Sequence, residues 1–250
     1  MLLGLLLGNT SLRYGLFDEG LILESGRIPW KDLEARAPEM EKALEGRRVR
    51  EIAAASVRDD LLPLVERILP RGLPALLLAR RDFPIPIENR YERPLEAGTD
   101  RLLNALAARE RSPGTGSIVV DFGSAISLSV VSPEGAFLGG LIAAGAAALQ
   151  IGVKEATPRL PAVQIELPRG FLQRESGPAL QAGLYWQVVG GVRAMVRGLV
   201  EDLSPARPKV LATGGGAALF APAVAEVDAV VPDLTLEGLH IALQKRREAP

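Results

Sequence analysis

Cysteine is absent from the 250-residue sequence and histidine occurs once, as His240, and these gaps exclude several kinds of chemistry. Without thiols the chain forms no disulfide, holds no zinc ion or iron–sulfur cluster through thiolates, and uses no cysteine nucleophile. One histidine cannot build a histidine-rich metal site, so any metal must be a hard cation held by oxygen atoms. His240 lies on the apolar side of the last expected helix, and we expect it to be structural.

A charge excess and a long apolar run are also missing. The 29 basic and 30 acidic residues give a formal net charge of -1, so no long-range field favours a nucleic acid or an anionic membrane as partner. The apolar run near the N-terminus is too short to span a bilayer and lacks the features of a signal peptide, so we interpret it as a strand. With 48% hydrophobic residues, we predict a cytoplasmic globular protein with a small-molecule partner.

Hydrophobic periodicity and turn residues predict a first half with the order β-β-β-α-β-α-β. Its expected strands cover residues 2–7, 12–17, 21–24, 50–56 and 75–79, and its expected helices cover residues 31–44 and 60–69. A long connection rich in proline and charge then leads to a helix that starts near Thr99. Long ordered loops in compact domains are often functional, so this connection is a candidate part of a site.

The same order begins again after the small residues of ERSPGTGS. Strands are expected at residues 117–121, 127–131 and 136–141, with a helix from about residue 144. Gly8 corresponds to Gly123 and Gly20 to Gly135 with one constant offset (123 − 8 = 115 and 135 − 20 = 115). The sequence therefore predicts an internal duplication.

A duplicated arrangement with a glycine-containing hairpin at the start of each half is similar to the actin, hexokinase and Hsp70 superfamily of ATP-binding folds. The resemblance implies an α/β protein of two duplicated ribonuclease H-like lobes, residues 1–112 and 113–250, with mixed sheets flanked by helices. In that superfamily the two hairpins hold the phosphates of the nucleotide between the halves, and glycine lets the backbone approach closely. From the hairpins alone, two simple tight turns are the alternative.

Seven motifs occur in one order along the chain. They are GNT at 8–10, Y..P...GTDR..NA.AA at 91–108, VDFGSA.S at 120–127, GG.I..G at 139–145, LP at 160–161, TGG at 213–215 and L.L.GL..AL at 234–243. Each motif alone is common, whereas the ordered set is specific and covers nearly the whole chain. On these motifs the sequence resembles the type III pantothenate kinase family.

The resemblance implies an enzyme that transfers the γ-phosphate of ATP to the hydroxyl of pantothenate, the first step of coenzyme A synthesis. It also implies Mg²⁺ or a similar divalent cation, a monovalent cation (K⁺ or NH₄⁺) and a homodimer. Asp100 would be the general base that accepts the hydroxyl proton, and Asp121 would contribute at the cation sites. The implied substrate-binding residues are Tyr91, Gly98, Thr99, Arg101 and Ser176, and the implied nucleotide-binding residues are Gly8, Asn9, Thr10, Gly123, Ser124, Gly214 and Gly215.

Each assignment also has a purely structural alternative. Asp100 and Arg101 could be an acid at a helix start beside a surface base, and Tyr91 could be a packing residue with a solvated hydroxyl. Asp121 could be a turn carboxylate, and TGGG could be a tight turn without a ligand. The joint order of the motifs is what favours the functional interpretation.

The sequence departs from the family pattern at two places that bear on activity. The first hairpin of the family normally reads Asp-x-Gly-Asn-Thr, and this chain has Leu6 at the aspartate position, although the duplicated position keeps an acid (6 + 115 = 121, Asp121). The loss is expected to weaken divalent metal binding. Near the pantothenate site, Glu175 and Ser176 stand in place of an Asn-Thr pair, which keeps a hydroxyl and adds a negative charge.

Two hypotheses follow from these departures. The first is an active type III pantothenate kinase; the second is a catalytically impaired paralogue that keeps the fold and serves a nucleotide-binding, regulatory or structural role. A sugar or acetate kinase of the wider superfamily fits the two halves but not the compact length or GTDR. We expect the nucleotide between the lobes and pantothenate near Asp100, and the apolar stretch LYWQVVGGVRAMVRGLV as dimer interface or intramolecular core.

Overall fold

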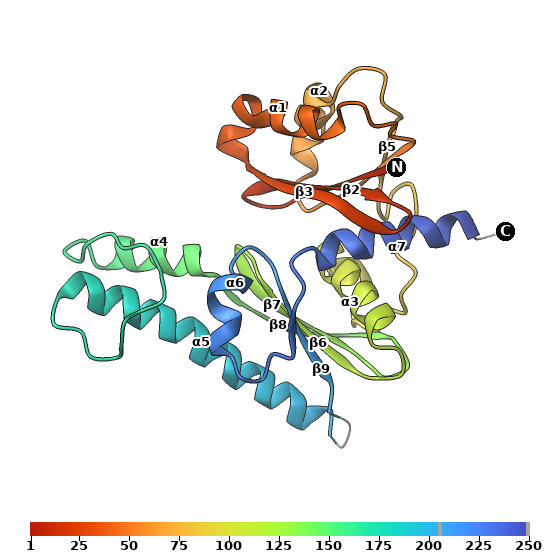
Figure 1. Ribbon diagram of the computed structural model, residues 1–250. Helices are drawn as coiled ribbons and strands as arrows, with labels where there is room; N and C mark the ends of the chain where they lie inside the picture. Colours follow the sequence, from red (N-terminus) through yellow and green to blue (C-terminus); the bar gives the residue numbers. More distant parts are fainter. Residues whose placement is uncertain (205–206, 249–250) are drawn as a thin grey trace. The chain divides into compact units, whose positions relative to one another are not determined.

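The computed structural model describes residues 1–204 and 207–248 and divides into two compact units. The first unit comprises Met1–Glu110 together with the segment from Asp233 onward, and the second comprises Arg111–Pro232. Each unit contains one five-stranded mixed sheet with helices beside it (Figure 1). Within the described residues, none of the helices combines the length and hydrophobicity that a bilayer span requires.

The sheet of the first unit has the order β3-β2-β1-β4-β5. Its strands are β1 (Leu2–Leu7), β2 (Ser11–Asp18), β3 (Leu21–Pro29), β4 (Glu51–Ser56) and β5 (Leu76–Leu78). Its helices are α1 (Leu33–Leu44), α2 (Leu62–Ile68), α3 (Thr99–Arg111) and α7 (Leu234–Glu248), with short 3-10 turns at Trp30–Asp32, Asp59–Leu61 and Pro94–Glu96. Strand β1 is antiparallel to β2 and parallel to β4.

Strand β1 carries no charge because both faces of its sheet are covered. Side chains alternate between the faces of a strand. Leu3 and Leu5 pack in one apolar cluster with residues of α1 and α2, whereas Leu2 and Leu6 pack in another with residues of α7. In Figure 1, α1 and α2 lie over one face of this sheet and α7 lies over the other. A strand buried on both faces reads as a continuous apolar run.

The sheet of the second unit has the order β10-β9-β6-β7-β8. Its strands are β6 (Ser117–Phe122), β7 (Ala125–Val131), β8 (Phe137–Ala144), β9 (Lys209–Thr213) and β10 (Ala229–Val230). Its helices are α4 (Ala146–Ala156), α5 (Ser176–Asp202) and α6 (Ala217–Phe220), with a short 3-10 turn at Ala221–Ala223. One apolar cluster joins β6 and β7 to α5 and α6, so the buried side of α5 is intramolecular core.

The internal duplication is evident in the two sheets. Read from its other edge, the second sheet has the order β8-β7-β6-β9-β10, which matches β3-β2-β1-β4-β5 strand for strand. The turn after the second strand of each half contains a glycine in the left-handed region, Gly20 at φ 88° and Gly135 at φ 90°. The predicted α/β duplication is therefore present in the fold.

Two details differ from the sequence prediction. Strand β3 runs to Pro29, five residues beyond its expected end at residue 24, because the alternation continues through Ser25 and Arg27. Helix α7 packs in the first unit, although the expected second lobe, residues 113–250, included it; residues 205–206 and 249–250 of that lobe lie outside the described residues. The physical reason is that Leu236 and Leu239 of α7 cover the face of the first sheet that contains Leu6.

Candidate active site

The first hairpin turn, Gly8-Asn9-Thr10, is held through its backbone. The Gly8 N–H donates to the Ser11 carbonyl at 3.1 Å, and the indole Nε1 of Trp30 donates to the Gly8 carbonyl at 2.8 Å. The Trp30 N–H donates to the Thr10 carbonyl at 3.2 Å. Asn9 and Thr10 are exposed. A backbone fixed in this way presents polar side chains to solvent in a defined position, as a ligand-binding turn requires.

Leu6, two residues before this turn, lies in an apolar environment. Its side chain is 8% exposed and belongs to the cluster that α7 covers, together with Ala55 of the neighbouring strand. In the antiparallel register Leu6 lies directly opposite Arg13 of β2. The first hairpin therefore has no carboxylate at this position, and the packing around the position suits an aliphatic side chain.

The second hairpin turn, Gly123-Ser124, packs against the start of α4. A Cβ atom added to Gly145, the N-cap residue of α4, would overlap the backbone carbonyl oxygens of Gly123 and Ser124. Only glycine permits this approach. Gly123 is exposed and Ser124 is half-buried. The hairpin and the beginning of α4 thus form one compact turn region.

Asp121 lies beside the glycine turn that follows β9. It is half-buried near the end of β6 and pairs in register with Thr213, the last residue of β9. Gly214 adopts φ 88°, and a Cβ atom there would overlap the Oδ1 atom of Asp121. Asp121, the second hairpin and the Gly214-Gly215 turn are therefore neighbours at the carboxyl ends of two parallel strands, which is where α/β sheets commonly bind ligands.

The acid at this edge suits a cation only with help from other oxygen atoms. Among the described residues, no group of three or more His, Cys, Asp or Glu side chains is arranged to hold a metal ion. Magnesium keeps several waters and is usually held by one or two carboxylates together with substrate phosphates. A single carboxylate at Asp121 fits that donor set, whereas it does not fit an all-protein metal cage.

The GTDR segment forms a second cluster, in the first unit, at the start of α3. Asp100 Oδ1 accepts the Arg101 N–H at 2.9 Å, and a Cβ atom on Gly98 would lie 2.6 Å from that same oxygen. Arg101 is 5% exposed, and its Cζ atom lies 5.6 Å from the centre of the Tyr91 ring. This distance is that of a cation–π contact. Four predicted substrate-site residues are thus grouped around Asp100, the fourth being the buried Thr99.

Ser176 lies in the other unit, as the first residue of α5. It is exposed, and Glu175 before it occupies the N-cap position. The predicted role of Ser176 in substrate binding, and the effect of the Glu175 charge, stay predictions.

Three residues near the first hairpin were not identified from the sequence. The Nε atom of Arg27 donates to Ser11 Oγ at 2.8 Å, and its Nη2 atom donates to Thr10 Oγ1 at 3.3 Å. The Nη2 atom of Arg13 donates to Asp233 Oδ1 at 2.8 Å. The signal for Arg27 was the uninterrupted alternation after Leu21, which a longer predicted strand would have included. No local signal links Asp233 to Arg13, 220 residues away.

Solved structures with low sequence identity have the same fold. MreB5 of Spiroplasma citri, in a structure with bound ADP, aligns over 100% of this chain and 98% of its own with a TM-score of 0.56 and 10% identity. Ta0583, an archaeal actin homologue, aligns over 98% of this chain and 99% of its own with a TM-score of 0.50 and 14% identity. The predicted actin-type fold of duplicated lobes is therefore confirmed.

Sequence comparison covers most of the chain with a single family. The family model described as type III pantothenate kinase matches residues 2–198. A type III pantothenate kinase of Dehalococcoides mccartyi is 32% identical, over 95% of this chain and 95% of the relative. One from Parafrankia sp. is 34% identical over 99% of both chains. The chain therefore belongs to the type III pantothenate kinase family.

Proposed function

We propose that this protein is a pantothenate kinase that transfers the γ-phosphate of ATP to the hydroxyl group of pantothenate. The observation that carries the proposal is the cluster at the start of α3, where the GTDR carboxylate of Asp100 is oriented by backbone and packed beside the buried Arg101. Family membership over nearly the whole chain supports the same reaction, which opens coenzyme A synthesis.

In this reaction Asp100 acts as the general base. The hydroxyl oxygen of pantothenate attacks the γ-phosphorus, the bond from that phosphorus to the β–γ bridging oxygen breaks, and ADP leaves with its electron pair. Asp100 accepts the hydroxyl proton, which requires an ionised carboxylate within hydrogen-bond distance of the substrate. Arg101 supplies a positive charge suited to the carboxylate of pantothenate, and Gly98, Thr99 and Tyr91 shape the site. Ser176 contributes a hydroxyl to substrate binding.

The phosphates of ATP are bound by backbone N–H groups and small polar side chains. The first hairpin contributes Gly8, Asn9 and Thr10, the second contributes Gly123 and Ser124, and the turn after β9 contributes Gly214 and Gly215. Asp121 fits a magnesium ion that arrives with the phosphates and keeps several waters. When bound, that ion lowers the charge of the transferring phosphoryl group, and a monovalent cation, K⁺ or NH₄⁺, supplies further positive charge.

A catalytically impaired paralogue is the alternative, and only Leu6 and the Glu175-Ser176 pair support it. Apart from the acid that Leu6 replaces, the proposed reaction uses two acids, Asp100 and Asp121. Both are present, and each lies in a defined polar cluster. We therefore favour an active enzyme. We also propose that it works in the cytoplasm, where ATP is available, and as a homodimer.

The test is direct detection of 4'-phosphopantothenate by mass spectrometry, with ATP, magnesium, potassium and pantothenate present. We expect wild type to form the product. Asp100→Asn is expected to lower kcat by about a hundredfold or more, since general-base catalysis contributes about 10²–10⁴-fold. Asp59→Asn, at an exposed acid in a short helical turn of the same unit, is the matched control and should keep wild-type activity. No product from wild type, or full activity of Asp100→Asn, would contradict the proposal.

A further inference from the structure

Three neighbouring strands of the first unit carry an unusual row of side chains beside the first hairpin. In register, Leu6 of β1 lies opposite Arg13 of β2, and Arg13 lies opposite Arg27 of β3. Directly opposite residues share one face of a sheet with Cβ atoms about 5 Å apart, and like charges in that arrangement are destabilising. Nearby anions would therefore stabilise these two facing arginines.

Among the described residues, a carboxylate pairs with one of these two arginines, Arg13. Asp233 binds Arg13 through Oδ1 at 2.8 Å, and its Oδ2 atom accepts the hydroxyl of Ser25 at 3.0 Å. Arg27 forms no ion pair within residues 1–204 and 207–248. Its only described partners are the neutral hydroxyls of Ser11 and Thr10. One positive charge is thus left over beside the hairpin, on an exposed side chain.

The two hydroxyl contacts orient the guanidinium of Arg27 and leave some of its hydrogen-bond donors unused. They use Nε and Nη2, so three of its five N–H donors are available to a ligand. The planar fork of arginine matches the oxygen atoms of a phosphate group. Since Thr10 belongs to the turn itself, the guanidinium is fixed against the turn that the proposed function assigns to nucleotide phosphates.

The equivalent row in the second unit has the opposite charge. There Asp121 lies opposite Ser127, and Ser127 lies opposite Ile142, so a carboxylate is present and arginine is absent. In the first unit, Leu6 stands at the position of the acid, and Arg13 and Arg27 occupy the next two positions of the row. The two hairpins of this duplicated chain therefore carry charge of opposite sign.

We propose that Arg27 binds nucleotide phosphate oxygens directly at the first hairpin, and that its charge replaces a cation that an acid in place of Leu6 would hold. The proposal rests on the proposed function, because it takes the hairpin as a phosphate-binding turn. Phosphate charge is then neutralised by Arg27 at the first hairpin. At the second hairpin it is neutralised by a cation at Asp121. Nucleotide diphosphate binding then depends only weakly on divalent metal.

The test is ADP binding to the full-length protein by calorimetry, in EDTA and in magnesium. Wild type should bind ADP in EDTA within about tenfold of its affinity in magnesium. Arg27→Gln should weaken binding in EDTA by about ten- to a hundredfold, because hydrogen bonds to charged groups contribute about 1.5–3 kcal/mol. Arg27→Lys, which keeps the charge and loses the fork, should recover part of the affinity. The salt dependence of binding should become shallower in Arg27→Gln and not in Arg27→Lys.

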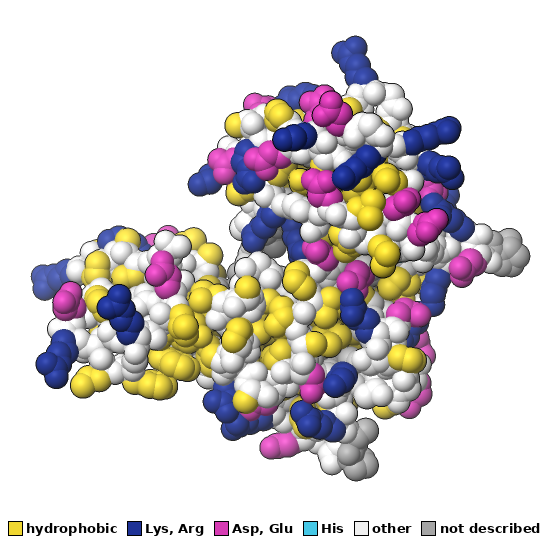
Figure 2. Space-filling model, viewed as in Figure 1, with side chains coloured by type: hydrophobic (Ala, Val, Ile, Leu, Met, Phe, Trp, Pro, Cys, Tyr) yellow, Lys and Arg dark blue, Asp and Glu magenta, His cyan; other side chains and the backbone are white. Residues whose placement is uncertain are grey.

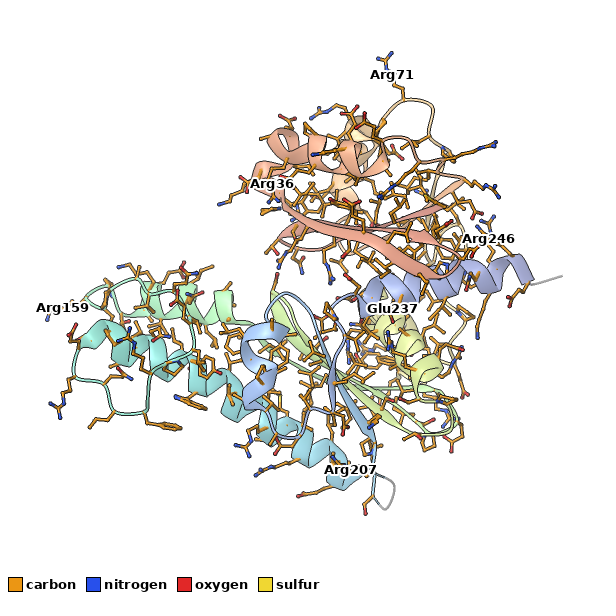
Figure 3. All side chains as sticks on the ribbon, in the orientation of Figure 1. Arg36, Arg71, Arg159, Arg207, Glu237 and Arg246 are labelled. Atoms are coloured by element: carbon orange, nitrogen blue, oxygen red, sulfur yellow. The ribbon has the colours of Figure 1, made fainter. Side chains whose placement is uncertain are left out.

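Arg71→Gln is the matched control, since Arg71 stands at the tip of the loop between α2 and β5, on the outer side of the same unit (Figure 3). It should bind ADP as wild type does. The proposal is overturned if Arg27→Gln binds ADP with wild-type affinity, or if wild type loses ADP binding in EDTA. A thermal unfolding curve for each variant separates lost binding from lost folding, and Arg27→Lys tests the proposal if Arg27→Gln does not fold. Pantothenate phosphorylation by wild type is measured separately, so the proposed function is judged by product formation and Arg27 by ADP binding.

Discussion

At the scale of single residues, position 6 has an aliphatic side chain that packs in an apolar cluster, where the family pattern has a carboxylate. Leu6 is 8% exposed and fills a space that α7 closes, so an aliphatic side chain there stabilises the first unit. A carboxylate at the same point would lie opposite Arg13, which already binds Asp233. An acid at position 6 would therefore be surrounded by the apolar side chains of this cluster and would lie opposite an arginine that is already paired.

Leu6→Asp is expected to lower the free energy of unfolding by about 2–5 kcal/mol, because it buries a charge and removes apolar contacts. Chemical denaturation measures this change. If the new carboxylate also held a cation, ADP binding would gain more from magnesium than it does in wild type. Leu6→Asn is the control: it also loses the apolar contacts but adds no charge, so its ADP binding should gain no more from magnesium than that of wild type. Unchanged stability in Leu6→Asp would contradict the packing described for position 6.

At the same scale, His240 of α7 packs as an aromatic ring against strand β2. Its ring stacks on Phe17 with the centres 4.7 Å apart, and burial lowers the pKa of the imidazole. The lowered pKa keeps the ring neutral within the α7 packing at pH 7. This agrees with the expectation that the single histidine is structural.

At the scale of elements, the close approach of α7 to α3 depends on one glycine. A Cβ atom on Gly238 of α7 would overlap the backbone carbonyl of Leu103 in α3. A backbone atom cannot move aside as a flexible side chain can, so the two helices would have to separate. The buried hydroxyl of Thr235 also donates to Asn104 Oδ1 at 2.7 Å, which fixes the rotation of α7 against α3.

Gly238→Ala is therefore expected to destabilise the first unit by about 1–3 kcal/mol, the usual cost of overpacking. The matched control is Gly198→Ala, at an exposed position of α5 where an added Cβ atom meets nothing within 4 Å. Glycine costs about 0.5–1 kcal/mol relative to alanine inside a helix, so the control should gain stability. Thermal and urea unfolding of both variants measure the difference. A gain in stability for Gly238→Ala would show that the helices are not in close contact.

At the scale of the whole molecule, the second unit exposes apolar side chains that one copy of the chain does not cover. Helix α4 contains no fully buried residue, and it lies beside α5. Exposed apolar side chains in this region include Ile142 of β8, Ile151 of α4, and Leu167, Phe171 and Leu172 in the segment between α4 and α5. Phe171 stacks on Trp186 of α5, and the region that carries these side chains is named the α4–α5 face. Figure 2 shows hydrophobic side chains gathered along this part of the molecule. Large exposed apolar patches on soluble proteins commonly mark interfaces.

We expect light scattering to give the mass of two chains for wild type, with the α4–α5 face at the interface. Leu172→Arg, at a side chain that is 82% exposed, should shift the protein toward one chain, because a buried unpaired charge is costly at an interface. Leu95→Arg is the control, since Leu95 is 87% exposed in the first unit and lies outside this face. A monomeric wild type, or a Leu172→Arg variant that stays dimeric, would contradict this assignment.

Much of the fold, and the proximity of some candidate site residues, followed from local patterns. Strand β1 matches its predicted bounds, and α3 begins at Thr99 as predicted, because an apolar run and a helix-start sequence are read within a few residues. The grouping of Tyr91 with Arg101 also lies within one short segment. The predicted end of β3 was wrong by five residues, and that error hid Arg27, since a residue outside a strand has no register partner.

The sequence by itself determined the duplication, the two hairpin turns, the GTDR helix start and the family, because each depends on residue order or on turn chemistry that acts over short distances. Only the tertiary structure decided that α7 returns to the first sheet and that Leu6, Arg13 and Arg27 form one row. It also brought Asp233 to Arg13 across 220 residues. The physical reason is that strand register and helix packing are set by burial of apolar faces between distant segments, which residue order does not reveal.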